Sequence, residues 1–254
     1  MLLGTPGRSD EDPSIRFSTI PKRHGGFRVI ARLAPPDDIR YRNAVAMIAA
    51  RVESSLPAAV VAERATTGRD AFARGPAFST EGYRSARRRF RSRARALARS
   101  RPGAVVLADV RSCFASITAE VVGERLLRLG CHPAEVGSVL SILERFGEHG
   151  VAGLPVGPHA SAVLANAVLG AADEAIAASG ARHLRWVDDF LVFPRRERDA
   201  HEVLERLAVA LDERGLELAA EKCAVEELYG TPLGRSLLAS GNGARVSPVA
   251  ASLG

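Results

Sequence analysis

The chain has 254 residues, of which 46% are hydrophobic and 25% charged, so it is long enough for one large or two small domains with buried cores. Its 35 Lys and Arg residues against 29 Asp and Glu residues give a formal net charge of +6, which favours an acidic partner such as nucleic acid over a neutral small molecule. Three cysteines without a CxxC spacing argue against a disulfide framework or a zinc site and indicate a reducing compartment. With neither a signal-peptide core nor an apolar run of about twenty residues, we expect a cytoplasmic protein that is not embedded in a membrane.

The first residues, 1–19, are polar, and we expect them to be mobile. The segment 20–33 then reads IPKRHGGFRVIARL, in which a Gly-Gly step between short apolar segments predicts a β-hairpin. Its basic residues include Lys22 and Arg28. Basic side chains on a hairpin can clamp phosphates, but they can equally solvate an exposed strand edge, and the hairpin alone leaves both interpretations open.

Two prolines follow the hairpin and predict a break. Residues 37–56 have apolar residues at helical spacing, and Asp37 or Asp38 stands where a helix cap is expected. Residues 57–80 carry glycines and prolines among mixed polar residues, which predicts a loop with at most one short helix.

Nine arginines lie between residues 83 and 101. If this segment is a helix, one stripe is apolar and a roughly opposite stripe consists of arginines: Arg84, Arg88, Arg91, Arg95 and Arg99. Like charges spaced four apart destabilise an isolated helix by a few tenths of a kcal/mol per pair, so an anionic partner should offset them. A nucleic-acid backbone is a better candidate than simple solvation of a basic face.

A buried strand is predicted at residues 104–108, which read AVVLA and deliver Asp109 at their end. An acid in this position is either presented at a sheet edge or serves as a cap for the following structure. Amphipathic helices are predicted over 120–129 and 133–146. Between them and a small-residue helix over 159–178 lies the loop GLPVGP, residues 153–158, whose glycines permit a ligand to approach the backbone closely.

The segment 184–193 reads LRWVDDFLVF, which predicts two short strands with the turn at Asp188 and Asp189. Adjacent carboxylates repel each other and gain most from a divalent cation, for which Mg²⁺ is the usual occupant, although a solvated polar turn is the simpler alternative. A helix over 199–214 follows, capped by Gly215, and then a segment ending near Lys222. The remaining residues to 254 are rich in Gly, Ser and Pro, and we expect little regular structure there.

Four stretches in fixed order resemble the palm motifs of reverse transcriptases. VVLADVRSCFASI resembles the first motif, GLPVGPHASAVLANAVL the second, RWVDDF the third and RGLELAAEKC the fourth, while IPKRHGGFRVI resembles the fingers hairpin that precedes them. The resemblance covers roughly residues 20–225, and its specificity lies in the combination of motifs. It implies an α+β right-hand polymerase of fingers and palm, with an antiparallel palm sheet, packed helices and a short or absent thumb.

The resemblance also implies a domain order. After the mobile residues 1–19, residues 20–102 would form a fingers-like region that includes the arginine-rich helix. Residues 103–230 would form the palm with the catalytic acids, and residues 231–254 would be a short tail or a thumb remnant.

The chemistry implied by the resemblance is two-metal nucleotidyl transfer of deoxynucleotides onto a primer 3′-hydroxyl along an RNA template. Asp109 and Asp188 would hold two Mg²⁺ ions, with Asp189 assisting and Mn²⁺ as a substitute, and the backbone carbonyl of Val110 would complete a coordination shell. Phe114 matches the steric-gate position that selects deoxynucleotides. The other nucleotide contacts that the resemblance implies are Lys22, Arg28, Gly157 and Lys222, of which Lys222 is a candidate proton donor or charge stabiliser.

The sequence departs from the family pattern in two places. Val156 stands where many members carry Gln, and the PVGP pattern together with RWVDDF resembles the bacterial abortive-infection and phage-defence branch. Too few residues follow the fourth motif for a full thumb, so either processivity is low or a partner protein or a non-coding RNA supplies the missing grip on the RNA template and DNA product.

Three alternatives to a reverse transcriptase follow from the same residues. A template-independent or protein-primed terminal transferase would use the same acids without a template. A non-catalytic nucleic-acid-binding scaffold would have no need to hold like charges together. An RNA-synthesising polymerase is disfavoured by Phe114.

Overall fold

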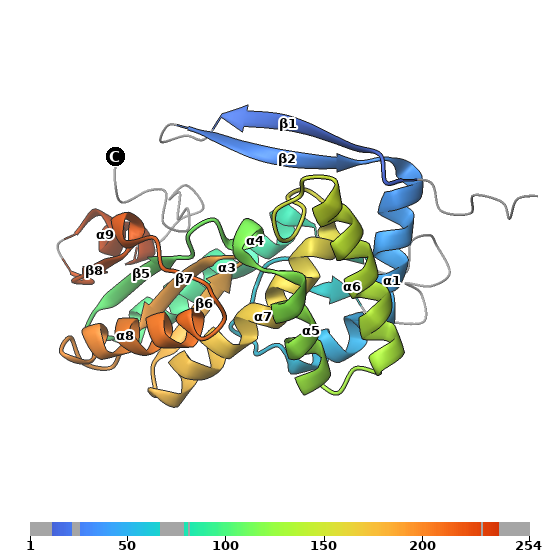
Figure 1. Cartoon of the computed structure of the whole chain (residues 1–254). Helices are drawn as coiled ribbons and strands as arrows, with labels where there is room; N and C mark the ends of the chain where they lie inside the picture. The colour runs from blue at the N-terminus through green and yellow to red at the C-terminus, as the bar shows by residue number, and fades with distance from the viewer. Residues whose placement is uncertain (1–11, 22–25, 67–78, 81, 230, 239–254) are drawn as a thin grey trace, which may run out of the picture.

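A computed structural model of the chain describes residues 12–21, 26–66, 79–80, 82–229 and 231–238 (Figure 1). Lys22 and residues 1–11 of the predicted mobile start lie outside the described residues, whereas residues 15–19, also expected to be mobile, belong to strand β1. The elements in chain order are β1 (Ile15–Pro21), β2 (Phe27–Leu33), α1 (Pro35–Ser55), β3 (Ala65–Thr66), β4 (Ser79–Thr80), α3 (Tyr83–Arg99), β5 (Val105–Asp109), α4 (Cys113–Ser116), α5 (Ala119–Arg128), α6 (Pro133–Glu148), α7 (His159–Ala178), β6 (Arg182–Trp186), β7 (Asp189–Phe193), α8 (Asp199–Asp212), η1 (Ala220–Lys222), β8 (Ala224–Glu226) and α9 (Pro232–Leu238).

The central sheet has four antiparallel strands in the order β6-β7-β5-β8. Its middle strand β5 is buried along its whole length, as expected for the β-branched run at this point of the sequence. The α+β fold class with an antiparallel palm sheet is therefore confirmed.

Helices cover both faces of this sheet. On one face Val106, Ala108, Phe190 and Val192 belong to the large core formed with α1, α5, α6, α7 and α8. On the other face Val105, Leu107, Leu191 and Phe193 pack with residues of α3 and α9 in a second core. The alternation of neighbouring residues between the two cores is the period of two that a strand imposes.

Helix α7 is the central packing element of the larger core. It is long and apolar enough to cross a membrane by length and composition, but 83% of its apolar window is buried inside the fold. Its small side chains, such as Ala160 and Ala167, allow close packing against α1, α5 and α8. Burial among other helices is the property of a core helix, and the small-residue stretch is therefore explained by packing.

The hairpin β1–β2 lies across one end of the molecule (Figure 1), with Thr19 opposite Val29 and Ile20 opposite Arg28. Its base packs on the large core through Ile15 and Leu33. The backbone amide of Ala31 donates to the carbonyl of Val156 at 2.9 Å, which docks β2 on the loop that precedes α7.

Several local expectations were wrong. Helix α1 begins at Pro35, because a proline is well tolerated in the first turn, and Asp37 accepts a hydrogen bond from the amide of Ser14 rather than capping the helix. The stretch after residue 223 is more regular than its composition predicts, since β8 completes the sheet and α9 packs on α3. Both elements were missed because each is short and is stabilised by tertiary contacts.

Helix α3 packs on the palm sheet. The arginine-rich helix, assigned from sequence to the fingers-like region, packs against strands β6 and β7 of the palm sheet. Trp186 of β6 meets Tyr83 and Phe90 of α3 edge-to-face, with ring centroids 5.5 and 5.7 Å apart.

Candidate active site

Two of the three predicted acids lie directly opposite each other. Asp109 ends β5 and is paired in register with Asp189, the first residue of β7. The carbonyl of Asp109 accepts a hydrogen bond from Ala219 on the other side of β5, at 2.8 Å, so the main-chain groups of Asp109 point away from β7. The pair is therefore of the non-hydrogen-bonded kind, in which facing side chains come closest.

The third acid lies in the turn of the β6–β7 hairpin. Trp186 pairs with Asp189, which leaves Val187 and Asp188 as a two-residue turn, so the predicted Asp-Asp turn was wrong by one residue. Val187 has a φ of +57°, a left-handed conformation that is strained for a β-branched residue. Such strain recurs at functional sites, where the surrounding structure maintains it.

The acids destabilise one another's ionised forms. Burial, reinforced by the charge of Asp109, raises the pKa of Asp188 to about 6. Burial, the charge of Asp188 and a hydrogen bond to Asp109 raise the pKa of Asp189 well above the ordinary range. A site that resists carboxylate ionisation in this way is one that a cation would stabilise.

Lys222 is a basic residue whose side chain contacts one of these acids directly. Its Nζ donates to Asp109 Oδ1 at 2.9 Å. The segment that carries it is held beside β5, because the amide of Arg111 donates to the carbonyl of Glu217 at 2.7 Å and Val110 bridges to Leu218. Partial burial opposes the ammonium charge, but Asp109 and the other two acids raise the pKa of Lys222 overall.

Val110 is buried immediately after Asp109. Because Asp109 and Arg111 direct their main-chain groups toward residues 217–219, the alternation of a strand turns the carbonyl of Val110 to the opposite side, the side of β7. This orientation is compatible with the role that the resemblance implies for Val110.

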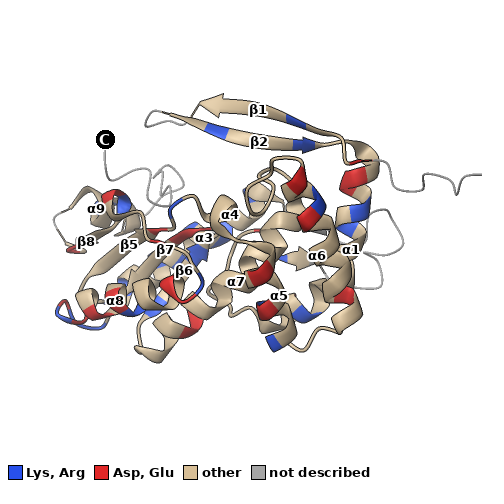
Figure 2. Cartoon of the chain, in the orientation of Figure 1, with Lys and Arg blue, Asp and Glu red and all other residues tan. Residues whose placement is uncertain are grey.

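The fingers hairpin presents a basic side chain to the acids. Figure 2 shows basic residues on both strands of this hairpin. The charge of Arg28 lowers the pKa of Asp188, in opposition to the larger effect of burial. Ile30 is on the same face of β2 and contacts the loop at Gly157, where an added Cβ would lie 3.2 Å from Ile30 Cγ2. The close approach seen at Gly157 is thus that of the chain's own β2.

Phe114 is half-buried in the short helix α4, directly after the strand that ends at Asp109. Its carbonyl accepts a hydrogen bond from Leu154 at 2.8 Å. A Cβ at Gly153 would lie 2.5 Å from this carbonyl oxygen, and Gly153 has a φ of +59°, so only glycine lets the loop reach α4 here. The loop therefore fixes the backbone at the predicted steric gate.

The arginine stripe of α3 lies opposite the apolar face that packs on the sheet, as predicted. Arg84, Arg88 and Arg99 are exposed, while Arg91 and Arg95 are half-buried. Burial and the neighbouring charges of Arg87 and Arg95 lower the pKa of Arg91. Such mutual repulsion along one face is the electrostatic footprint expected of a surface that receives an anion.

Other arginines of α3 have structural partners that the sequence did not reveal. Arg89 donates to the carbonyl of Val61 at 3.0 Å, and Arg93 donates to the carbonyl of Ala58. These contacts fasten the segment that follows α1 to α3.

Sequence reasoning also missed a buried polar cluster behind the catalytic turn. Its members come from α7 and β6, and each is at most 8% exposed: Asn166, Asp173, His183 and Arg185. Two polar residues seven positions apart on one face of an otherwise apolar helix were the available signal.

The donor chemistry of the three acids suits Mg²⁺, a hard cation that prefers carboxylate oxygens. Asp109 and Asp189 face each other, and Asp188 follows from the adjoining turn. Among the described residues, no three acidic, histidine or cysteine side chains already converge closely enough to enclose an ion. Lys222 is hydrogen-bonded to Asp109 Oδ1, so a cation held at this oxygen would displace the ammonium group.

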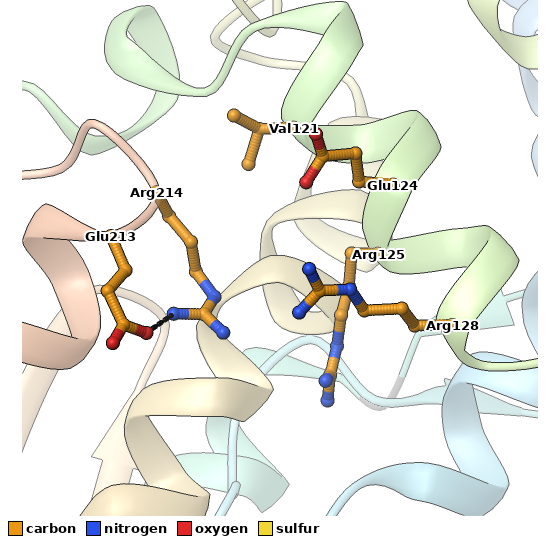
Figure 3. Close-up of a pocket in the computed structure, with 6 residues that line it drawn as sticks. All are labelled: Val121, Glu124, Arg125, Arg128, Glu213 and Arg214. Atoms are coloured by element: carbon orange, nitrogen blue, oxygen red, sulfur yellow. Dashed lines mark hydrogen bonds and ion pairs between the residues drawn. The ribbon is translucent and has the colours of Figure 1, made fainter.

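A cavity of about 230 Å³ lies elsewhere, between α5 and the residues that end α8 (Figure 3). The guanidinium groups of Arg125 and Arg214 that line it are held by neighbouring groups: Arg125 by Glu174 at 2.7 Å, and Arg214 by Glu213 at 3.1 Å. None of the predicted site residues lines this cavity.

The fold is shared with solved structures of yeast telomerases. A Candida albicans telomerase in complex with a fragment of telomeric RNA matches with a TM-score of 0.57 and 14% identity over 88% of this chain and 43% of that chain. Apo telomerase from Candida tropicalis matches with a TM-score of 0.55 and 13% identity over 89% of this chain and 46% of that chain. At these identities the likeness shows the fold alone, and the chain spans less than half of either telomerase chain.

No curated protein matches the sequence closely enough to serve as a relative. A family model described as "Reverse transcriptase (RNA-dependent DNA polymerase)" matches residues 20–234, which include the fingers hairpin, all three acids and Lys222. The match confirms the predicted enzyme class, and the chain belongs to the reverse transcriptase family of RNA-directed DNA polymerases.

Proposed function

We propose that this chain adds deoxynucleotides to a primer 3′-hydroxyl opposite an RNA template, with Asp109, Asp188 and Asp189 as its catalytic acids. The observation that carries the proposal is the arrangement of three carboxylates from two strands and one strained turn, in which burial and then mutual repulsion raise the pKa values of Asp188 and Asp189. A fold that only bound nucleic acid would gain nothing from holding these charges together.

The three acids, with the carbonyl of Val110, are the residues that would hold divalent cations. When bound there, Mg²⁺ supplies activation of the primer 3′-hydroxyl and neutralisation of the triphosphate. Lys222, released from Asp109, holds a positive charge and a proton beside the reacting phosphate and can donate that proton to the leaving group. Arg28 contacts the triphosphate from the hairpin side.

Selection of deoxynucleotides is proposed to depend on Phe114. Phe114 lies five residues after Asp109 in the chain, and its backbone carbonyl is fixed by the hydrogen bond from the amide of Leu154. A ring carried at this backbone position would exclude a 2′-hydroxyl by steric contact.

The RNA template or the product strand is proposed to contact the exposed arginines of α3. Three of the five stripe residues are exposed and form one face on the outside of the palm sheet. Their contacts would be with phosphates, which carry no sequence information but supply salt-dependent affinity.

A primer-extension experiment tests the function. Purified protein with Mg²⁺ or Mn²⁺ is given a DNA primer on an RNA template, the same primer on a DNA template, or the primer alone. We expect deoxynucleotide incorporation that requires the RNA template.

Two of the rival functions predict other outcomes in the same experiment. Extension of the primer without a template would instead establish a terminal transferase. No incorporation in any lane, with the RNA still bound, would favour a non-catalytic scaffold or a polymerase that requires a partner protein or a non-coding RNA for its grip.

The cellular setting is proposed from the resemblance to the abortive-infection branch. We propose a bacterial, cytoplasmic enzyme that acts in antiviral defence. Expression in a phage-sensitive bacterium should reduce phage plaques for the wild type but not for Asp188→Asn, and equal plaque numbers for the two would contradict a catalytic role in defence.

A further inference from the structure

Arg185 connects the interior of the palm to the turn that carries Asp188. Its side chain is fully buried, and its guanidinium donates to both carboxylate oxygens of Asp173, at 3.0 and 2.7 Å. A third donor, Nη1, bonds both Asn166 Oδ1 at 2.7 Å and the carbonyl of Val187 at 2.9 Å. The same guanidinium lies over the ring of Phe190, 5.8 Å from its centroid, on the second strand of the hairpin.

The partners of Arg185 are themselves held in place. Asp173 accepts a hydrogen bond from His183 Nε2 at 2.9 Å. Burial alone would raise the pKa of Asp173, but the charge of Arg185 and these hydrogen bonds lower it, so Asp173 is ionised and the pair is charge-balanced. Asn166 uses its amide group to donate to the carbonyls of Ala62 and Glu63.

The backbone of Arg185 is anchored as well. Its amide donates to the carbonyl of Ala59 at 2.9 Å, and its carbonyl accepts from the amide of Val61 at 3.0 Å. The guanidinium is therefore attached to a frame built from α7, β6 and the segment after α1. A guanidinium that is held by this frame can restrain the carbonyl of Val187, to which it donates a hydrogen bond.

The group that it restrains at the site is strained. Val187 has a φ of +57°, which a β-branched residue adopts only when its surroundings impose it. The carbonyl of Val187 belongs to the peptide group that joins Val187 to Asp188. A hydrogen bond to this carbonyl fixes the orientation of the peptide group and therefore the direction in which the Asp188 side chain leaves the turn. A buried ion pair alone is poor support for stability, whereas an ion pair that also reaches into a strained turn has a positional role.

We propose that Arg185, held by Asp173 and Asn166, is a positioning residue that keeps the Val187–Asp188 turn strained and directs Asp188 toward Asp109 and Asp189. The catalytic consequence of this inference rests on the proposed polymerase function, whereas the restraint on the turn does not. Loss of the restraint lets Val187 relax toward an ordinary φ and moves the Asp188 carboxylate. A displacement of about 1 Å at a reacting centre can lower a rate by about 10²-fold.

Arg185→Lys is the most informative substitution. Lysine keeps the positive charge beside Asp173, but its single ammonium group cannot also reach Asn166 and the Val187 carbonyl in the way that a planar guanidinium does. Arg182→Lys, on the same strand but exposed, is the matched control. If Arg185→Lys does not fold, the double substitution Asp173→Asn with Arg185→Gln removes both charges together and serves the same purpose.

Three readouts separate positioning from stability. Hydrogen exchange of the peptide that spans residues 184–193 reports on the turn, Mn²⁺ binding to the protein alone reports on the acids, and steady-state kinetics report on kcat and KM. For Arg185→Lys we expect a folded protein with a lower unfolding midpoint, because the buried acceptors of Asn166 and Val187 lose their donor. At a temperature where the variant is folded, exchange of this peptide should be at least about tenfold faster, Mn²⁺ binding weaker by about tenfold and kcat lower by about 10²-fold. At saturating Mn²⁺, KM for the deoxynucleotide should change by less than about threefold, because the displaced group then acts in the chemical step.

A second substitution provides a rescue. Glycine adopts positive φ without strain, so Val187→Gly in the Arg185→Lys background should restore a large part of the lost Mn²⁺ affinity and of kcat. Wild-type exchange, Mn²⁺ binding and kcat in a folded Arg185→Lys protein would overturn the proposal, as would a double variant no better than Arg185→Lys alone. If the wild type itself did not polymerise, the proposed function would fail, but the exchange and Mn²⁺ measurements would still decide whether Arg185 positions the turn.

Discussion

Replacing Asp188 with asparagine removes a charge that the fold opposes, so the variant should be more stable than the wild type at alkaline pH in the absence of metal. The folded-state pKa of Asp188 is raised to about 6, above the value of 3.8 for an unperturbed aspartate, chiefly by burial and then by the charge of Asp109. Between these values the folded state binds more protons than the unfolded state. The free energy of unfolding therefore falls as the pH rises through this window and stays lowered above it.

The size of this effect can be bounded. A shift of about two pKa units corresponds to about 3 kcal/mol, which is an upper limit. Asp188 is half-buried, and screening by solvent reduces the expected effect to about 1–2 kcal/mol. For a domain of this size, such a gain raises the unfolding midpoint by about 2–8 °C.

Thermal unfolding of the wild type and Asp188→Asn, followed in a chelating buffer at pH 4 and pH 8, measures the difference. We expect nearly equal midpoints at pH 4 and a higher midpoint for the variant at pH 8. Asp199→Asn, in the first turn of α8, where the side chain is partly exposed and pairs with Arg198, serves as the matched control and should not show this gain in stability at pH 8. A variant that was less stable than the wild type at pH 8, or equally shifted at both pH values, would refute the repulsion argument.

Three further outcomes are expected. Gly153→Ala should lower the free energy of unfolding by about 3 kcal/mol in denaturant titration, because its Cβ would lie 2.5 Å from the Phe114 carbonyl oxygen. Gly180→Ala, where φ is also positive but no atom lies near the added Cβ, should lower it by only about 1 kcal/mol. Equal losses in the two variants would argue against the close approach at Gly153. Phe114→Ala should reduce discrimination against ribonucleotides by at least about tenfold in single-nucleotide incorporation, and unchanged discrimination would contradict the steric-gate assignment. Arg88→Gln combined with Arg99→Gln should reduce the slope of log affinity for single-stranded RNA against log salt by about 1 to 2, and an unchanged slope would place the RNA elsewhere.

Strong local patterns predicted much of the fold and the acids of the site. The apolar run that delivers Asp109, the small-residue helix α7 and the hairpin around Asp188 were all predicted from residue type and spacing, because each is stabilised by a pattern contained within one segment. The arginine stripe of α3 was predicted for the same reason, since helical spacing alone places its members on one face.

Features that depend on contacts between distant segments were not predictable. The sequence around Arg185 does not indicate that its side chain is buried and hydrogen-bonded. Its side-chain partners Asp173 and Asn166 lie 12 and 19 residues away in the sequence, and its backbone pairs with Val60. The bond between Lys222 and Asp109 spans 113 residues. The strand β8 has only three residues, too few for a periodic signal, and exists because β5 offers it an edge.

The most direct test of the central claim is extension of a DNA primer on an RNA template with Mg²⁺, comparing the wild type with single Asn substitutions of Asp109, Asp188 and Asp189 and with Asp199→Asn as the control. We predict template-dependent deoxynucleotide incorporation by the wild type and by the control. Each of the three acid variants should be slower by at least about 10³-fold, as expected when a group that stabilises transition-state charge is lost. Full activity of Asp109→Asn or Asp188→Asn would contradict the assignment of these carboxylates as the catalytic centre.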